Sequence, residues 1–449
     1  MAVLVGIVSA GLVGPAAHAA STGVRINEVE SSGGSPGDWI ELTNTSASTV
    51  DLSGWVLKDN DDSHVFTIAS GTSLPPGGFV ALDVDPVYGL GSSDSARLYQ
   101  PGGTTLVDSY SWTSHASTTY GRCPDGTGPF VTTVASTKGG PNACPPPPAA
   151  TWPGGTAVAN ADATNEFGTN LSGLSFQSAG VVWAVDNGPG TLYRLVPNGS
   201  LWKLDTTGGF SSGKTLHYLS GSGDPDAEGV VYTPDGVLVS SERDNDHNGT
   251  SLMKVMRYDP TATATTLNAT AEWNLTGDLP AADPNSGLEG IAWVPDSTLT
   301  GAGLHDEHTN APYNPSNYSN HGTGLYFVAS EATGTIYAYA LNLAGGSFTR
   351  IATIASGLPA VMDLEWEPST GRLRAECDDT CSGQTTTLVV NTSGRFAVTA
   401  SYKRPSGMSN YNNEGFAIAP TCAAGVKTVL WSDDSNDKSH ALRSGTLSC

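Results

Sequence analysis

The residues best suited to chemistry are acids that recur beside glycine in the last two-thirds of this 449-residue chain. Glu228, Glu289 and Glu414 each precede a glycine and a short apolar stretch with the period-two alternation of a strand. Carboxylates brought to one point repel one another unless a cation offsets their charge. They can instead accept backbone N–H groups from a neighbouring strand. The sequence leaves both readings open, a cation site and a structural role.

A second set of acids ends the strand that follows each of these glycines. Glu242, Glu331 and Asp433 belong to this set, and Arg243 comes directly after Glu242. The carboxylates are candidate ligands for a hard cation. The guanidinium of Arg243 is a candidate for binding an anionic group. Together these residues predict a site where a metal and an anionic substrate meet.

The segment from Asp244 to Gly249 matches the opening of a calcium loop, Asp-x-Asp-x-Asn-Gly. Its candidate ligands are Asp244, Asp246 and Asn248. The closing Glu of an EF-hand is absent, because Val255 stands in its place. An ordinary Asx-rich turn explains the same residues. The alternatives at this loop are therefore a short Ca²⁺ loop between strands and a turn.

A repeated unit positions these acids. We call the residue just before the repeat's glycine its anchor. The five anchors are Ser172, Glu228, Glu289, Met362 and Glu414, at intervals of 56, 61, 73 and 52 residues. Each unit contains short strand-like segments, up to four, which predicts an all-β, five-bladed β-propeller over residues 156–449. A sixth blade would need roughly forty more residues. The last unit is one strand short, and we expect residues 156–165 to complete it.

This region resembles the propeller family named for the esterase-like activity of phytase. The resemblance rests on the Glu-Gly anchors, on Gly290-Ile291-Ala292-Trp293 and on Glu242-Arg243. It implies a metal-binding propeller, with Ca²⁺ as the expected ion, that hydrolyses a small phosphoester or ester. The candidate catalytic residues are Glu289, Glu228, Glu414 and Arg243. The candidate metal ligands are Glu242 and Glu331, together with the loop residues Asp244, Asp246 and Asn248. Ser172 and Met362-Asp363 depart from the Glu-Gly pattern, so the expected acidic ring is incomplete.

Residues 21–144 have a different organisation, with short alternating strands at even spacing between turn signals, which predicts a β-sandwich. Ile26-Asn27-Glu28-Val29, Asp38-Trp39-Ile40-Glu41-Leu42 and Leu52-Ser53-Gly54-Trp55 resemble the lamin-tail domain, an immunoglobulin-like sandwich. The resemblance implies an accessory role with a cell-surface or protein partner. This segment carries five basic and thirteen acidic residues. That balance argues against DNA binding.

The ends and joints of the chain predict an exported protein. Residues 1–20 are apolar and end in a small-x-small cleavage pattern, as in a signal peptide. Residues 145–155 are rich in proline, which predicts a stiff linker. Disulfides are the expected state of six cysteines in an exported chain. The expected pairs are Cys123 with Cys144, Cys377 with Cys381, and Cys422 with Cys449.

Composition narrows the class of partner. The chain has 20 Lys and Arg against 43 Asp and Glu, a formal net charge of −23. Nucleic acids and anionic membranes need basic patches, so we expect neither as a partner, and we expect no membrane span. Two functions stay open: a secreted Ca²⁺-dependent hydrolase of phosphoesters or esters, and a non-catalytic extracellular binding protein.

Overall fold

The computed structural model describes residues 23–449, and the predicted signal peptide lies outside this range. The regular secondary structure of the described chain is almost entirely β-strand, as the sequence predicted. It divides into two compact units, one built mainly from residues 23–116 and the other mainly from residues 141–449. No described helix is long and apolar enough to cross a membrane.

The first unit contains two main antiparallel sheets and one small one. The strands are β1 (Val24–Glu30), β2 (Trp39–Asn44), β3 (Val50–Asp51), β4 (Val56–Lys58), β5 (Phe66–Thr67), β6 (Ser73–Leu74), β7 (Phe79–Asp83), β8 (Asp94–Tyr99) and β9 (Leu106–Trp112). One sheet pairs β1 with β2 and β2 with β7, the other runs β5-β4-β8-β9, and β3 pairs with β6. Strand β1 packs against β8 and β9, so the two main sheets share a core, as in a β-sandwich.

The next hairpin pairs β10 (Tyr120–Arg122) with β11 (Phe130–Thr132). The proline-rich segment after it contacts the second unit. The backbone of Ala150 bonds to Ser401 and Lys403, and the indole of Trp152 donates to the carbonyl of Thr446 at 2.8 Å. Residues 150–152 therefore form part of the edge of the second unit.

The second unit contains five main sheets, which are antiparallel except for the parallel pairing of β17 with β21 in the first. The first contains β13 (Leu171–Ser178), β14 (Val181–Asn187), β15 (Gly190–Asn198), β16 (Leu201–Leu204), β17 (Lys214–His217) and β21 (Thr266–Asn268). The second contains β18 (Pro225–Thr233), β19 (Gly236–Asp244), β20 (Ser251–Tyr258) and β22 (Ala271–Asn274). The third contains β23 (Leu288–Pro295), β26 (Gly324–Ser330), β27 (Thr335–Leu341) and β28 (Phe348–Ala355).

The fourth sheet contains β29 (Asp363–Glu367), β30 (Arg372–Glu376), β31 (Thr385–Val390) and β32 (Phe396–Tyr402). The fifth contains β33 (Asn413–Ile418), β34 (Val426–Asp433), β35 (Leu442–Ser448) and β12 (Ala159–Asn160). Strand β12 pairs with β35, so the segment 156–165 supplies the missing strand, as predicted.

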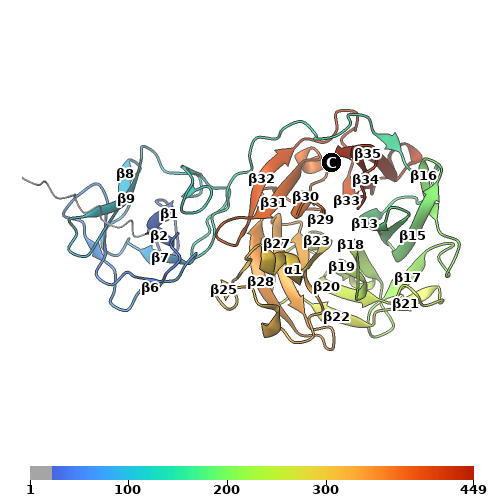
Figure 1. The fold of residues 1–449 in the computed structure, drawn as a ribbon, viewed down its shortest axis with the longest axis horizontal. Helices are drawn as coiled ribbons and strands as arrows, with labels where there is room; N and C mark the ends of the chain where they lie inside the picture. Colours follow the sequence, from blue (N-terminus) through green and yellow to red (C-terminus); the bar gives the residue numbers. More distant parts are fainter. Residues whose placement is uncertain (1–22) are drawn as a thin grey trace, which may run out of the picture. The chain divides into compact units, whose positions relative to one another are not determined.

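The first strands of the five sheets contact one another in cyclic order: β13 with β18, β18 with β23, β23 with β29, β29 with β33, and β33 with β13. We call these five the inner strands. Figure 1 shows the sheets spread around a common centre, with the inner strands nearest to it. Apolar side chains fill the spaces between consecutive sheets. One such cluster joins Val185 to Val239, and the next joins Leu238 to Val328.

Shorter elements connect the sheets. They are α1 (Asp296–Gly301), the small pair β24 (His305–Asp306) and β25 (Ala311–Pro312), and the 3-10 turns η1 (Asn245–His247), η2 (Pro315–Asn317), η3 (Asp379–Cys381) and η4 (Asp437–Ser439). All three predicted disulfides are present: Cys123–Cys144, Cys377–Cys381 and Cys422–Cys449. The last one ties the end of the chain to the loop before β34.

Candidate cation site

The glycines of the repeat let the inner strands approach closely. A Cβ atom on Gly173 would collide with the backbone of Glu228 and Gly229, and one on Gly229 would collide with the carbonyl of Glu289. Gly290 stands in the same relation to Asp363. Each glycine therefore permits a backbone contact that any side chain would block. The close approach brings the acids beside these glycines toward the centre of the unit.

Two groups of three carboxylates result, and they share one residue. In each group, the oxygens lie within 4.8 Å of one another. One group is Asp226, Glu228 and Glu242, and the other is Glu242, Glu289 and Glu331. Together with Glu414 of β33, which influences the pKa of both Glu228 and Glu289, we call these six residues the acid cluster. They come from three inner strands and from the ends of β19 and β26.

Few groups donate hydrogen bonds to these carboxylates. Glu228 accepts hydrogen bonds from the hydroxyl of Ser172 at 2.9 Å and from the amide of Asn187 at 3.2 Å. Glu242 accepts one from the backbone N–H of Gly287 at 2.7 Å. Glu289 is only 4% exposed, and no group within residues 23–449 donates a hydrogen bond to its carboxylate. A buried carboxylate in that state lacks the compensation that burial normally requires.

Only one of the two carboxylate oxygens of Glu414 has a hydrogen-bond donor. Its Oε1 accepts a hydrogen bond from Asn412 at 3.1 Å, whereas its Oε2 is buried with no partner within the described chain. The same Asn412 amide lies 3.3 Å from a carboxylate oxygen of Asp434. Two acids therefore share one amide at this edge of the cluster.

Within residues 23–449, Arg243 is the one cationic side chain beside the cluster, and it already has partners. Nε of Arg243 lies 2.5 Å from Oδ2 of Asp226, and its side chain also bonds to the side-chain oxygen of Asn285. The guanidinium therefore offsets the charge of Asp226. It leaves the carboxylates of Glu228, Glu242 and Glu289 without a basic partner of their own.

Burial and mutual repulsion raise the pKa values of these acids. Burial is the largest cause at Glu242, where repulsion from Asp226 adds to it and the pKa rises to about 8. Burial and then Glu228 hold the pKa of Glu289 well above its usual range. At Asp226, burial outweighs the attraction of Arg243 and raises the pKa to about 6. The ionised cluster is therefore costly unless protons or a cation bind.

In the fourth repeat the acid has the structural role that the sequence left open, because it accepts backbone N–H groups. Asp363 takes the place of a Glu-Gly anchor, and its carboxylate accepts backbone N–H groups from Phe416 at 2.7 Å, Leu364 at 2.8 Å and Leu174 at 3.3 Å. Leu174 and Phe416 belong to the inner strands β13 and β33. Asp363 therefore joins three inner strands through backbone hydrogen bonds.

The loop after β19 forms a capped turn. Asp244 is the N-cap of η1 and accepts from the backbone N–H of Asp246 at 3.1 Å, while Asn248 ends the turn. Neither Asp244 nor Asp246 belongs to either carboxylate group. The hydrogen bond from the N–H of Asp246 to Asp244 is the one expected of an Asx turn.

Sequence reasoning missed two acids at the site, Asp226 and Asp434. Asp226 lies two residues before Glu228 on β18, so the alternation of a strand was the available signal. In the fifth repeat the sequence pointed to Asp433, which instead lies 3.3 Å from the guanidinium of Arg443. Burial raises the pKa of Glu414, and among the neighbouring charges Asp434 raises it most.

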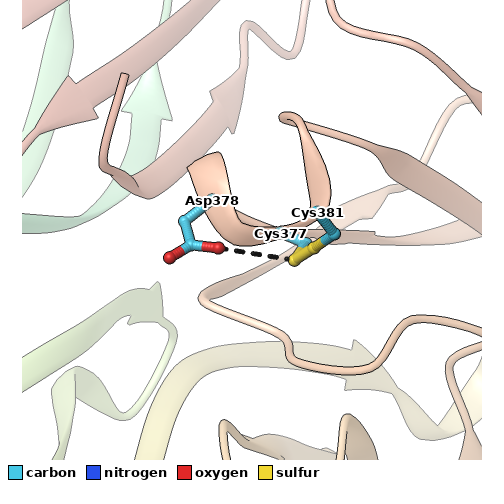
Figure 2. A group of neighbouring side chains, drawn as sticks. All are labelled: Cys377, Asp378 and Cys381. Atoms are coloured by element: carbon cyan, nitrogen blue, oxygen red, sulfur yellow. Dashed lines mark hydrogen bonds between the residues drawn. A yellow bond between two sulfur atoms is a disulfide. The ribbon is translucent and has the colours of Figure 1, made fainter. Parts of the chain in front are cut away.

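A third group of potential ligands lies at η3 and comprises Cys377, Asp378 and Cys381. Figure 2 shows the two sulfurs joined as a disulfide, with Asp378 beside them. A disulfide sulfur is no thiolate ligand. Asp378 also accepts a hydrogen bond from the N–H of Thr380 at 3.0 Å, as the cap of the turn. This group is structural.

Comparison with known proteins identifies part of the chain. Residues 17–114 match the Lamin Tail Domain family, which supports the resemblance noted for the first unit. No curated protein sequence matches the chain.

Three solved structures show distant likenesses. A protein of unknown function from Bacteroides caccae is 9% identical, with a TM-score of 0.32, over 60% of this chain and 80% of its own. A functionally unknown protein from Desulfotomaculum acetoxidans is 10% identical, with a TM-score of 0.30, over 62% and 69%. A mitotic checkpoint complex structure is 12% identical, with a TM-score of 0.30, over 100% and 99%. Similarity at this level carries no argument about fold or function.

Proposed function

We propose that the second unit is a five-bladed β-propeller whose acid cluster holds Ca²⁺, in a secreted protein that hydrolyses a small phosphoester or ester. The cyclic contacts among the five inner strands support the propeller. The three disulfides support export, because such bonds persist in oxidising compartments.

The state of Glu289 carries the proposal for a cation. Its carboxylate is buried against Glu228, Glu242, Glu331 and Glu414 and accepts no hydrogen bond from the described chain. The cluster offers only oxygen ligands, which suit Ca²⁺ better than the softer transition metals. Glu242, Glu289 and Glu331 would hold the ion on one side, and Asp226 and Glu228 would extend the site on the other.

The expected chemistry follows from the donor set. A bound divalent cation supplies Lewis acidity, which polarises an ester or phosphoester and makes a bound water more acidic. The chain's own residues supply proton transfer. Glu414 lies outside both carboxylate groups, and burial and then Asp434 hold its pKa well above the usual range, which suits a general acid.

A specific observation favours a second candidate, a non-catalytic extracellular binding protein. Arg243, the residue assigned to the anionic substrate, is held by Asp226 and Asn285. Binding an anion would require Arg243 to leave Asp226 or to share its charge. In this second candidate, Ca²⁺ stabilises the propeller, and both units serve as recognition surfaces. The Lamin Tail Domain match supports an interaction role for the first unit in either candidate.

Activity assays on the mature chain separate the candidates. Purified protein would be incubated with Ca²⁺ and either p-nitrophenyl phosphate or p-nitrophenyl acetate, beside Glu289→Gln and the exposed-site control Asp283→Asn. The hydrolase proposal predicts turnover that EDTA and Glu289→Gln abolish and Asp283→Asn preserves. Ca²⁺ binding without turnover of either substrate would reject the hydrolase and leave the binding protein.

A further inference from the structure

The inner strands carry the acid cluster near one end and enclose a cavity near the other. The cavity has a volume of about 250 Å³, and residues of all five inner strands and of β34 line it. Phe176, Tyr232, Trp293 and Trp366 of its lining each stand four residues beyond an anchor, which is about 13 Å along a strand. The cavity is therefore separate from the acid cluster. We call it the Lys427 cavity, after the one lysine in its lining.

Two bases share a single carboxylate at the Lys427 cavity. The ammonium of Lys427 lies 2.7 Å from Oε1 of Glu367, and the guanidinium of Arg374 donates to Oε2 at 3.0 Å and 3.2 Å. All three side chains are at most 4% exposed. Burial opposes the ionisation of Glu367, but the two bases outweigh it and lower its pKa. One negative charge therefore faces two positive charges.

The second acid of the lining does not supply the missing charge. Burial and then repulsion from Asp363 hold the pKa of Glu365 well above its usual range, although Arg374 attracts the ionised form. A protonated carboxyl is neutral and can donate a hydrogen bond. The cavity therefore keeps one positive charge uncompensated at neutral pH. A buried charge in that state is costly, so the lining favours an anionic ligand.

The polar groups of the lining are mainly donors. The ammonium of Lys427 meets two acceptors, Glu367 and the hydroxyl of Ser369 at 2.5 Å, whereas an ammonium has three N–H groups. Trp293 and Trp366 also line the cavity, and the indole N–H of each is buried without an acceptor in residues 23–449. Buried donors without acceptors are costly, so a ligand that brings acceptor oxygens suits this lining.

The size and the apolar part of the lining narrow the ligand further. Cavities for drug-sized ligands measure roughly 300–1,000 Å³, so a smaller molecule suits this one. Phe176, Val231 and Ile291 offer it apolar surface. A carboxylate carries one negative charge, which matches the one uncompensated positive charge. A phosphate carries about two, and it would leave the excess unpaired.

We propose that the Lys427 cavity binds a small monocarboxylate with an apolar body. The carboxylate pairs with Lys427 and accepts hydrogen bonds from the indole N–H groups, and the apolar body packs against the side chains of the inner strands. This site needs neither Ca²⁺ nor hydrolysis at the acid cluster.

Calorimetric titration of the metal-free mature protein with benzoate and with benzamide tests the proposal. The two compounds have nearly the same shape, but benzamide is uncharged, and without a metal the acid cluster offers benzoate nothing to bind. Benzoate should bind at least about tenfold more tightly, because hydrogen bonds to a charged group are stronger. Equal affinities, no binding of benzoate, or tighter binding of inorganic phosphate than of benzoate would overturn the proposal.

A substitution at Lys427 locates the binding. Lys427→Met removes the uncompensated charge and keeps an unbranched stem, so the preference for benzoate over benzamide should fall about tenfold. The matched control Lys203→Met makes the same change at an exposed position of β16 and should leave the preference unchanged. An unchanged preference in Lys427→Met would reject the site.

A measurement on the unmodified protein decides even if Lys427→Met does not fold. In the nitrogen-15 spectrum of the tryptophan side chains, saturating benzoate should shift the indole signals of Trp293 and Trp366. The indole of Trp152 already donates to the carbonyl of Thr446, far from the cavity lining in sequence, and serves as the internal reference. Unshifted signals of both Trp293 and Trp366 would reject the site.

Discussion

Both units bury acids, but they compensate them differently. In the first unit Glu41 is fully buried, yet it accepts hydrogen bonds from the amide of Asn27 at 3.1 Å and from the N–H of Gly139 at 2.6 Å. Asp94 accepts from three backbone N–H groups. In the second unit Glu289 accepts none from the described chain and lies among other acids. Burial of an acid is therefore no sign of a site, whereas convergence without donors is.

The same contrast occurs within the second unit. Asp363 and Glu289 occupy adjacent repeats, yet three backbone N–H groups donate to Asp363. A carboxylate with three such donors is a structural bridge. The predictions below test whether these two kinds of buried acid respond differently to mutation, calcium and pH.

The largest effect is expected from Asp363→Ala. It removes the acceptor for three backbone N–H groups, each worth about 1–3 kcal/mol when left unsatisfied, so the free energy of unfolding should fall by about 3 kcal/mol or more. Chemical denaturation measures this, and Asp363→Asn should lose less because one acceptor oxygen remains. The stabilisation that calcium gives should survive in both variants. Its loss would place Asp363 among the cation ligands and erase the contrast with Glu289.

Removal of calcium should act on one unit only. At a concentration a hundred times its Kd, a ligand stabilises the folded state by about 2.7 kcal/mol. Hydrogen exchange with and without EDTA should therefore show faster exchange in β18, β19 and β23 of the calcium-free protein. Peptides from β1 and β2 serve as the internal control and should not change. Equal changes in both units, or none, would break the comparison.

A pH dependence of smaller size follows from the raised pKa values. The folded pKa of Asp226 is about 6 and that of Glu242 about 8, both above their unfolded values. Such groups favour folding fully at pH values below the unfolded pKa, and this contribution is lost as the pH rises through the folded pKa. Calcium-free protein should therefore become progressively less stable between pH 5 and pH 9.

The melting temperature, followed across this range, checks the prediction. Asp186 and Asp363 titrate in the same window, with pKa values of about 7 and about 8. Glu242→Gln therefore isolates the cluster, because it should flatten the profile only in part. Saturating calcium should flatten it further. A calcium-free protein that becomes more stable toward pH 9 would contradict the assigned direction.

The smallest effect is expected at the turn η1. Asp244→Ala removes an N-cap, a change that costs about 1 kcal/mol. Thermal unfolding should show this loss with and without calcium. The calcium affinity should stay the same, since Asp244 lies outside both carboxylate groups. A several-fold weaker affinity would restore this loop as a cation site.

The sequence predicted local features better than contacts between residues that are distant in the chain. The strands of both units, the closure by β12 and the three disulfides follow from alternation, spacing and cysteine count. The repeat also located Glu228, Glu242, Glu289 and Glu331, because strand ends in successive units occupy equivalent places.

Which charged side chains pair with one another depends on their distances in the folded protein. The repeated sequence pattern does not give these distances. Arg243 is adjacent to Glu242 in sequence but pairs with Asp226 across the strands. Asp434, rather than Asp433, influences Glu414, because Asp433 lies beside Arg443. Two of the three donors that separate Asp363 from Glu289, the N–H groups of Leu174 and Phe416, belong to other sheets. No pattern within one repeat reveals them.

Calorimetric titration of Ca²⁺ into the metal-free mature protein tests the central claim most directly. We predict saturable binding that tightens as the pH rises, because the carboxylates release protons when the cation binds. Glu289→Gln should weaken this binding at least tenfold, while the exposed-site control Asp283→Asn should bind like the unmodified protein. Absence of binding, or an unchanged affinity in Glu289→Gln, would contradict a cation site at the acid cluster.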